Sequence, residues 1–221
     1  MVAERVAVSA ARSLTETLEE QRVVAVVTIE RATDALPLAD ALAAGGVRAI
    51  EITLRTDAAR SAIEAVAKGR PEMIVGAGTV RDARSLRAAR DAGAQFVVSP
   101  GFTPALHAAA AAAALPWLPG VATASEILLA MEAGHALLKF FPAEAAGGTR
   151  ALRAFAAVFP EVGFCPTGGI TADNLRGYLE LPNVVCVGGT WLAPAPLMAA
   201  REWPKIQALA AHAAALASGR K

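Results

Sequence analysis

Eight short apolar segments recur along the chain, and a helix-forming segment separates each of them from the next. The apolar segments are rich in β-branched and aromatic residues and show little polar alternation, which is typical of parallel strands covered on both faces. Glycine or proline ends most of the helical segments between them. The strands are expected at residues 23–28, 49–53, 73–76, 96–99, 117–120, 137–141, 163–167 and 184–187.

Regular alternation of strand and helix favours a parallel sheet built with right-handed crossovers. Eight such units match a closed (β/α)8 TIM barrel, and 221 residues lie near the lower size limit of that fold. We therefore expect a single α/β domain over residues 1–221. An extra N-terminal helix is expected at 13–20, where Ser13 and Glu16 have the spacing of a capping box. An open doubly wound sheet is the alternative, although no GxGxxG motif follows the first strand.

Composition narrows the function classes. The chain is 55% hydrophobic and 19% charged, and its formal net charge of +1 gives no electrostatic reason to expect nucleic acid or a membrane surface as partner. Cys165 and Cys186 lie in apolar segments, which indicates buried thiols rather than disulfides or metal ligands. The three histidines have no metal-ligand spacing, so no metal is expected. We see no apolar leader, and the longest apolar run, 108–118, is too short to span a membrane, so a soluble cytoplasmic protein is expected.

Two ionisable residues lie inside expected strands. Lys139 lies in the apolar segment 137–141, where an ammonium must reach solvent, find a carboxylate or lose its proton. A neutral amine is the nucleophile that Schiff-base chemistry requires. Glu51 lies between Ile50 and Ile52, so it points into the barrel if both isoleucines face the helices. The two side chains therefore converge either as a catalytic pair or as a buried ion pair, and such pairs stabilise proteins weakly.

Further polar residues follow the carboxyl ends of the strands, where barrels of this kind place their active sites. Arg55 suits a substrate carboxylate, or is a solvated loop arginine. Thr79 ends the glycine-rich segment 76–79, in which backbone can approach a ligand closely. Glycine pairs in segments 167–169 and 188–190 leave backbone N–H groups free for a phosphate at a helix start, or form two tight turns.

These segments carry a resemblance to a known family. Over about residues 14–209, the sequence resembles the 2-keto-3-deoxy-6-phosphogluconate (KDPG) aldolases, also known as 4-hydroxy-2-oxoglutarate (KHG) aldolases, which are class I aldolases. The lysine motif and the CPTGGI motif are together specific for this family. The shared motifs are AAGGVR (43–48), EITLRT (51–56), VGAGTV (75–80), GAQF (93–96), SPG (99–101), KFFPAE (139–144), FCPTGGI (164–170) and GGTWL (188–192).

The resemblance implies a homotrimer of (β/α)8 barrels that works without metal or other cofactor. It implies cleavage of a phosphorylated 2-keto acid, KDPG, to pyruvate and glyceraldehyde 3-phosphate, with KHG as a further substrate giving pyruvate and glyoxylate. Lys139 would be the Schiff-base residue, and Glu51 would accept and donate protons through water. The residues implied in substrate binding are Arg55, Thr79, Pro100, Phe141, Thr167, Gly168, Gly169, Gly189 and Thr190.

Two positions depart from the family pattern. Thr190 stands where the better-known members have serine, which bears on phosphate or sugar-acid preference, and Ala25 stands where they often have proline. Three other functions stay open at this point. They are an aldolase for the galactonate epimer or a non-phosphorylated acid, a phosphate-binding isomerase or epimerase with Glu51 as base, and a phosphosugar-binding protein without catalysis. Trapping an imine at Lys139 separates the aldolases from the other two.

Overall fold

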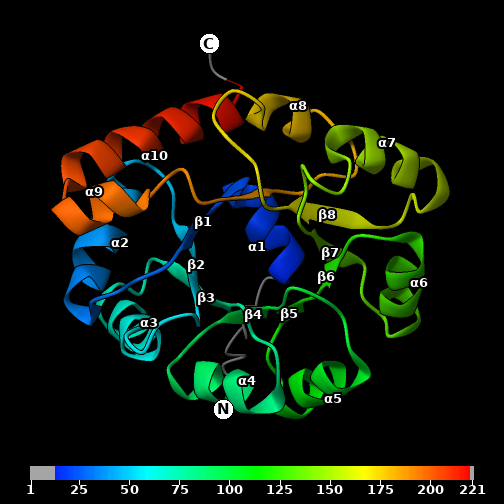
Figure 1. The fold of residues 1–221 in the computed structure, drawn as a ribbon, viewed down its shortest axis with the longest axis horizontal. Helices are drawn as coiled ribbons and strands as arrows, with labels where there is room; N and C mark the ends of the chain where they lie inside the picture. Colours follow the sequence, from blue (N-terminus) through cyan, green and yellow to red (C-terminus); the bar gives the residue numbers. More distant parts are fainter. Residues whose placement is uncertain (1–12, 220–221) are drawn as a thin grey trace, which may run out of the picture.

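The structure, a computed structural model of the chain, describes residues 13–219. Strands and helices alternate through these residues, and Figure 1 shows the strands gathered around the centre with most helices outside them. The strands are β1 (Val23–Val27), β2 (Ala49–Thr53), β3 (Ile74–Gly78), β4 (Phe96–Val98), β5 (Trp117–Leu118), β6 (Gly120–Val121), β7 (Leu137–Phe140), β8 (Gly163–Pro166) and β9 (Val187–Gly189).

The helices are α1 (Leu14–Gln21), α2 (Ala35–Ala44), α3 (Ala59–Gly69), α4 (Ala83–Asp91), α5 (Pro104–Ala113), α6 (Ala124–Glu132), α7 (Gly148–Val158), α8 (Leu175–Leu179), α9 (Ala195–Ala200) and α10 (Trp203–Ala217), with a 3-10 turn at Ala32–Asp34. Each of α2 to α9 follows a strand in the chain, α10 follows α9, and Figure 1 shows these helices outside the strands, with α1 in the middle of the view. None of the helices within residues 13–219 is long and apolar enough to cross a bilayer.

The strands form two parallel sheets, so the expectation of a closed eight-stranded TIM barrel is wrong. A six-stranded half-barrel has the order β5-β4-β3-β2-β1-β9, and a smaller sheet has the order β6-β7-β8. The sheets part at Pro119, which divides the expected strand 117–120 into β5 and β6 because proline has no N–H to donate to a ladder. The chain is therefore an α/β protein with two sheets.

The second break lies between β8 and β9, where two isolated bridges replace a continuous ladder. These bridges join Phe164 to Val184 and Thr167 to Gly188. Between the two bridges, the β8 segment advances from 164 to 167, whereas the β9 segment advances from 184 to 188. The β9 segment therefore contains one extra residue, which interrupts the register. The expected strand at 184–187 consequently begins only at its last residue.

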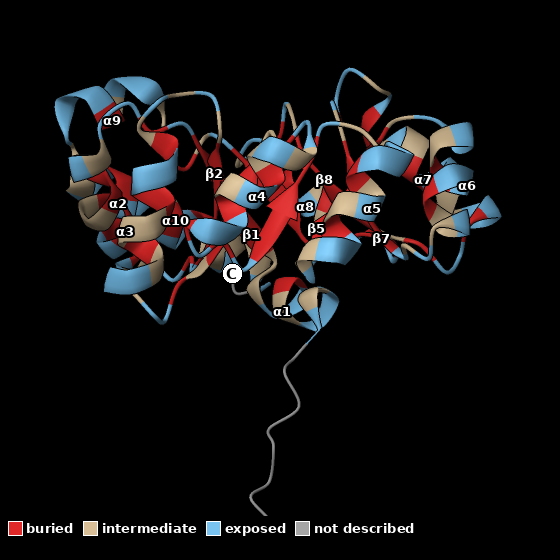
Figure 2. Ribbon diagram, turned by 90° about the horizontal axis from the view of Figure 1, so that it is seen from below, coloured by how far each residue is buried: buried red, intermediate tan, exposed pale blue. Residues whose placement is uncertain are grey.

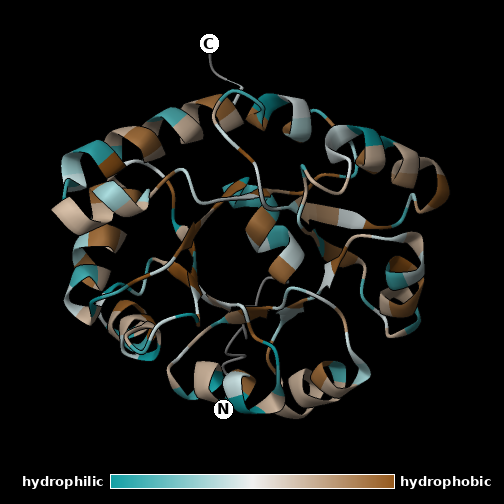
Figure 3. Ribbon diagram, in the orientation of Figure 1, coloured by the Kyte–Doolittle hydropathy of each residue, from teal (hydrophilic) through white to brown (hydrophobic). Residues whose placement is uncertain are grey.

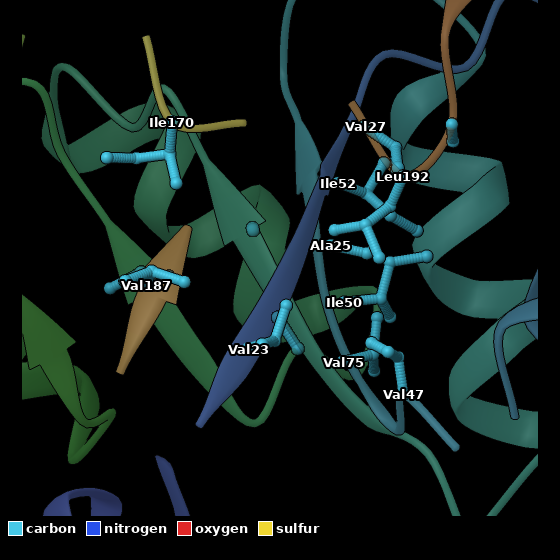
Figure 4. Close-up of a cluster of buried hydrophobic side chains, with 14 of the residues drawn as sticks. Val23, Ala25, Val27, Val47, Ile50, Ile52, Val75, Ile170, Val187 and Leu192 are labelled. Carbon is cyan, nitrogen blue, oxygen red and sulfur yellow. The ribbon is translucent and has the colours of Figure 1, made fainter. Parts of the chain in front are cut away.

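The core has two parts because successive strand side chains point to opposite faces. Ile50, Ile52 and Val75 belong to the large cluster between strands and helices, part of which Figure 4 shows. Ala49 belongs instead to a second, inner cluster, together with Leu18 of α1. Figure 2 shows buried residues concentrated in the strands and on the inward faces of the helices, and Figure 3 shows the same division by hydropathy.

The helix expected at 13–20 is present as α1. The Ser13 side chain accepts the N–H of Glu16, and the Glu16 carboxylate accepts the N–H of Ser13, so both halves of the capping box form. Leu18 is fully buried in the inner cluster, and Figure 2 shows α1 on one side of the strands. This helix covers the inner cluster from the side on which the strands begin. The expectation of one domain over residues 1–221 stays a prediction, since its ends lie outside the described residues.

The two cysteines are free and buried, as the sequence predicts. Cys165 and Cys186 both belong to the inner cluster. A hydrogen bond with Cys165, followed by burial, raises the pKa of the Cys186 thiol well above its ordinary value. Within residues 13–219, no group of three or more His, Cys, Asp or Glu side chains is placed to hold a metal ion.

Candidate active site

Lys139 and Glu51 meet inside the molecule. Lys139 Nζ donates a hydrogen bond to Glu51 Oε1 at 3.2 Å, and the two residues are 6% and 4% exposed. Glu51 lies in β2, between β1 and β3, and Lys139 lies in β7, between β6 and β8. The pair therefore joins the middle of the six-stranded sheet to the middle of the three-stranded sheet.

Strand alternation places both side chains on the inner face. Leu138 and Phe140 pack in the outer cluster, whereas Leu137 belongs to the inner one, so Lys139 shares the inward face with Leu137. Glu51 has room beside β3 because its neighbour there is glycine. A Cβ added at Gly78 would overlap the Glu51 carboxylate, so this position must lack a side chain.

The surroundings of the amine are apolar on one side. Lys139 Nζ lies 5.2 Å from the centre of the Phe141 ring, within range of a cation–π contact. On the other side, Glu51 Oε2 makes no hydrogen bond with the described residues. Among residues 13–219, only Asn183 Oδ1 is a side-chain N or O atom that is both fully buried and without a hydrogen-bond partner. Glu51 Oε2 also has no partner, so it is not fully buried and keeps some accessible surface. The carboxylate can thus hold the amine through one oxygen and reach water through the other.

Arg55 and Thr79 contact each other after the carboxyl ends of β2 and β3. Arg55 Nε donates to Thr79 Oγ1 at 3.1 Å, although the residues lie in the separate loops that follow β2 and β3. Thr79 has a φ of 59°, a left-handed conformation that a β-branched residue rarely adopts. The strained backbone turns this hydroxyl toward the guanidinium, and strain of this kind is common at ligand sites.

Pro100 and Phe141 follow the ends of β4 and β7. Pro100 is exposed, and its backbone lies so close to Gly120 that a Cβ there would overlap the Pro100 carbonyl. The half-buried Phe141 ring lies against Gly168, where an added Cβ would be 3.4 Å from it. Phe141 therefore links the lysine to the first of the two glycine-pair loops.

The two glycine-pair loops are neighbours. Thr167 pairs with Gly188 across the gap between β8 and β9, and a Cβ at Gly188 would overlap the Thr167 hydroxyl. The Trp191 ring covers Gly189 so closely that no side chain fits there. Thr190 is exposed beyond it. The helix that follows the first of these loops, α8, begins only at Leu175 and ends at Leu179.

Sequence reasoning singled out neither Glu144 nor two further residues that contact the first loop. Asn174 Nδ2 donates to the Gly169 carbonyl at 3.0 Å, and the Tyr178 hydroxyl donates to Glu144 Oε1. Glu144 belongs to the lysine motif, so its position in that motif was an available signal. Asn174 lies just before α8, and its contacts with Gly169 and Thr171 span only five and three positions, so its place after the loop was a local signal. Tyr178 lies in α8, and its bond to Glu144 spans 34 positions, too many for local patterns to reveal.

A large cavity in the described residues lies away from this site. It has a volume of about 560 Å³ and includes His107, Trp117 and His135 in its lining, together with residues of α1. None of the predicted site residues lines it. The chemistry is therefore located by the convergence of polar side chains rather than by cavity size.

Comparison with known proteins assigns the chain to a family. A family model described as "Aldolase: KDPG and KHG aldolase" matches residues 14–209. The chain belongs to the KDPG and KHG aldolase family. Aldolases are lyases, so this is an enzyme family of the reaction class that a lysine–glutamate pair suits.

Named relatives and solved structures agree with this assignment. The 2-dehydro-3-deoxy-phosphogluconate aldolase of Pseudomonas aeruginosa is 50% identical over 194 residues, which are 88% of each chain. The KHG/KDPG aldolase of Escherichia coli is 50% identical over 191 residues, covering 86% of this chain and 90% of the relative. The crystal structure of KDPG aldolase from Legionella pneumophila, with pyruvate captured as a covalent carbinolamine, has a TM-score of 0.87 at 43% identity and covers 89% and 96% of the two chains.

Proposed function

We propose that this aldolase cleaves KDPG to pyruvate and glyceraldehyde 3-phosphate through a Schiff base on Lys139. The observation that carries the proposal is the buried Lys139 amine, 3.2 Å from Glu51 Oε1. A buried Lys–Glu pair is costly to maintain and stabilises a fold weakly, so a purely structural role explains it poorly. The covalent pyruvate adduct in the Legionella pneumophila relative supports the same chemistry.

The cleavage begins when neutral Lys139 attacks the 2-keto carbon of the substrate. Loss of water yields a protonated imine, which withdraws electrons from the bond between carbons 3 and 4. Glu51, acting through water, takes the proton of the 4-hydroxyl, and that bond breaks with release of the aldehyde. The enamine of pyruvate is then protonated at carbon 3, and hydrolysis of the imine frees pyruvate and the amine. The accessible oxygen of Glu51 suits this proton transfer.

The two ends of the substrate have separate candidate partners. Arg55 and Thr79 hold the carboxylate of the pyruvate portion, because a guanidinium beside a hydroxyl matches a carboxylate. Pro100 and Phe141 lie at the carboxyl ends of β4 and β7 and flank that portion. The loop at 167–169, with Gly189 and Thr190 of the next loop, binds the phosphate and the hydroxyls.

KHG is a second substrate in this proposal. The name of the Escherichia coli relative includes KHG as well as KDPG, and a solved relative at 42% identity is described as a 4-hydroxy-2-oxoglutarate aldolase and phosphogluconate aldolase. KHG shares the pyruvate portion and lacks the phosphate. Rates measured on KDPG, on its galactonate epimer and on KHG decide the preference among them.

We further propose that the enzyme is a cytoplasmic homotrimer. The family resemblance supports this assembly, and the balanced net charge is compatible with it. Sedimentation of the purified protein should give three times the chain mass of 22.6 kDa. A species at the chain mass itself would reject the trimer without affecting the catalytic proposal.

Borohydride reduction in the presence of pyruvate tests the catalytic proposal directly. The imine should be reduced to a stable amine, and peptide mapping should locate the pyruvyl adduct on Lys139. Lys205, which is exposed and paired with Glu202, provides an internal control because it should stay unmodified. An unmodified Lys139 in a protein that still cleaves KDPG would reject the Schiff base and favour an acid–base mechanism.

A further inference from the structure

A cluster of three side chains holds the outer side of the loop at 167–171. The cluster consists of Glu144, which follows β7, and of Asn174 and Tyr178, which lie before and within α8. We propose that these three residues position the loop to receive the substrate's phosphate and so set the preference for phosphorylated substrates. The inference rests on the proposed function, and it adds positioning residues that touch the loop rather than the reacting atoms.

The contacts on the outer side of the loop use its backbone carbonyl groups rather than its N–H groups. The carbonyls of residues 167 and 168 accept the N–H groups of Ala143 and Glu144 at 2.8 and 3.1 Å. The Gly169 carbonyl accepts Asn174 Nδ2 at 3.0 Å. By contrast, no hydrogen bond among residues 13–219 uses the N–H groups of Gly169 and Ile170. Three consecutive carbonyls are thus occupied, and two consecutive donors stay available for an anion.

The side chains of the cluster also hold one another. The Tyr178 hydroxyl donates to Glu144 Oε1, and Asn174 Nδ2 lies 3.5 Å from the same oxygen. Asn174 Oδ1 accepts the N–H of Thr171 at 2.8 Å, so this amide joins the middle of the loop at Gly169 to its end at Thr171. Tyr178 is fully buried, and its burial and the bond to Glu144 raise its pKa, so the hydroxyl keeps its proton as a donor.

Glu144 also contacts the loop directly. Its Cγ lies where a side chain at Gly169 would be, at 2.5 Å from an added Cβ. Gly168 and Gly169 have φ values of 99° and 82°, which few residues other than glycine adopt. A glycine pair loses much conformational freedom when it is ordered, and contacts that order it in advance reduce the cost of binding. Loss of the cluster should therefore weaken phosphate binding and leave the chemistry at Lys139 intact.

Asn174→Ala in the full-length enzyme tests the inference, because it removes both amide contacts with the loop. The KM for KDPG should rise about tenfold, while kcat changes less than about twofold. The KM for KHG, which has no phosphate, should stay within about twofold. Exchange of the pyruvate methyl protons with solvent, which needs no phosphate, should also be unchanged. Inorganic phosphate should inhibit the variant more weakly than the wild type.

Tyr178→Phe provides a second variant that keeps the buried ring and removes the hydroxyl alone. It should shift the same parameters in the same direction by about threefold. Asn183→Ala is the matched control, because Asn183 Nδ2 also donates to a backbone carbonyl, that of Leu152, but not to this loop. Its KM ratio between KDPG and KHG should equal that of the wild type.

Three results would overturn the inference. They are an equal rise in KM for KDPG and KHG, a loss of pyruvate exchange in step with KDPG cleavage, and unchanged KM values in both cluster variants. The first two would indicate a general structural role for the cluster. A wild-type enzyme that exchanged no pyruvate protons would instead reject the proposed function, and the positioning role with it.

Discussion

Two buried carboxylates in this molecule have opposite surroundings. Asp34 and Glu51 are each 4% exposed. Asp34 accepts Arg31 Nε at 2.8 Å through one oxygen and Arg201 Nε at 3.0 Å through the other. Glu51 accepts a single bond, from Lys139, through one oxygen.

The cations differ as much as the carboxylates do. The Arg31 and Arg201 side chains are 47% and 53% exposed, so they keep much of their hydration while they satisfy Asp34. The Lys139 side chain is 7% exposed. Arginine keeps its proton under all ordinary conditions, whereas a buried lysine can give its proton up. A carboxylate whose two oxygens both accept hydrogen bonds from hydrated arginines is suited to a structural role. A carboxylate with one unbonded oxygen beside a buried lysine is suited to proton transfer.

Lys139→Met should show the largest functional difference between the Glu51 site and the Asp34 site. Removal of the amine eliminates the imine, so kcat/KM for KDPG should fall by about 10⁴-fold or more. Lys205→Met makes the same change in an exposed ion pair and should leave kcat/KM within about twofold. Steady-state assay of pyruvate release measures both variants. Residual turnover above one part in about a thousand would contradict the role of Lys139.

Glu51→Gln should have the next largest effect. The amide preserves the shape of the side chain and removes the proton acceptor, so kcat should fall by about 10² to 10⁴-fold. The borohydride adduct at Lys139 should still form from pyruvate, though more slowly. A variant with nearly normal kcat would show that Glu51 only neutralises the lysine, as Asp34 neutralises its arginines.

Asp34→Ala should lower stability rather than turnover, in contrast to the Lys139 and Glu51 variants. Its loss leaves two half-exposed guanidinium groups without their partner, and we expect the free energy of unfolding to fall by about 1–3 kcal/mol. The kcat/KM of the folded enzyme should stay within about threefold. Urea unfolding and steady-state kinetics on one preparation measure both quantities. A large loss of kcat/KM with unchanged stability would place Asp34 in the active site.

The His107–His135 pair is a third case, because the contact between these two rings involves no carboxylate. His107 Nδ1 and His135 Nε2 lie 3.1 Å apart, and burial, followed by the charge of His107, lowers the pKa of His135. The folded state therefore binds fewer protons than the unfolded state below the ordinary value of 6.5. The contribution of this pair should be complete above that value and decline as the pH falls below it.

Urea unfolding at about pH 7.5 and at about pH 5.5 measures this smaller effect. His135→Gln should lose less stability between the two conditions than the wild type. An equal loss in both proteins would assign the acid sensitivity to other groups.

Much of the fold follows from local pattern, but its closure does not. Alternating apolar and helical segments correctly predict most strands and helices, since burial on both faces selects such runs. Pro119 shows the limit. Its missing N–H was visible in the sequence, yet whether that gap ends a sheet depends on the ladder partners on either side. The shift from the 164–184 pairing to the 167–188 pairing is equally invisible, because register is a relation between distant segments.

The candidate site divides in the same way. Glu51 and Lys139 could be singled out because each interrupts an apolar strand, and Arg55, Thr79 and the glycine pairs because they follow strand ends. The contact between Glu144 and Tyr178 could not be predicted in this way, because it spans 34 positions of the chain. Asn174 contacts Gly169 and Thr171 within five positions, but only the folded structure shows that the same amide also approaches Glu144.

The positions of most strands along the chain, the inward direction of the lysine and glutamate, and the glycines at strand ends were all readable from the sequence, since backbone geometry over a few residues dictates each of them. The 3.2 Å approach of two groups 88 positions apart, the division into two sheets and the contacts behind the 167–171 loop emerged on folding. These depend on which distant segments become neighbours, and that outcome reflects the packing of the entire core rather than any local stretch.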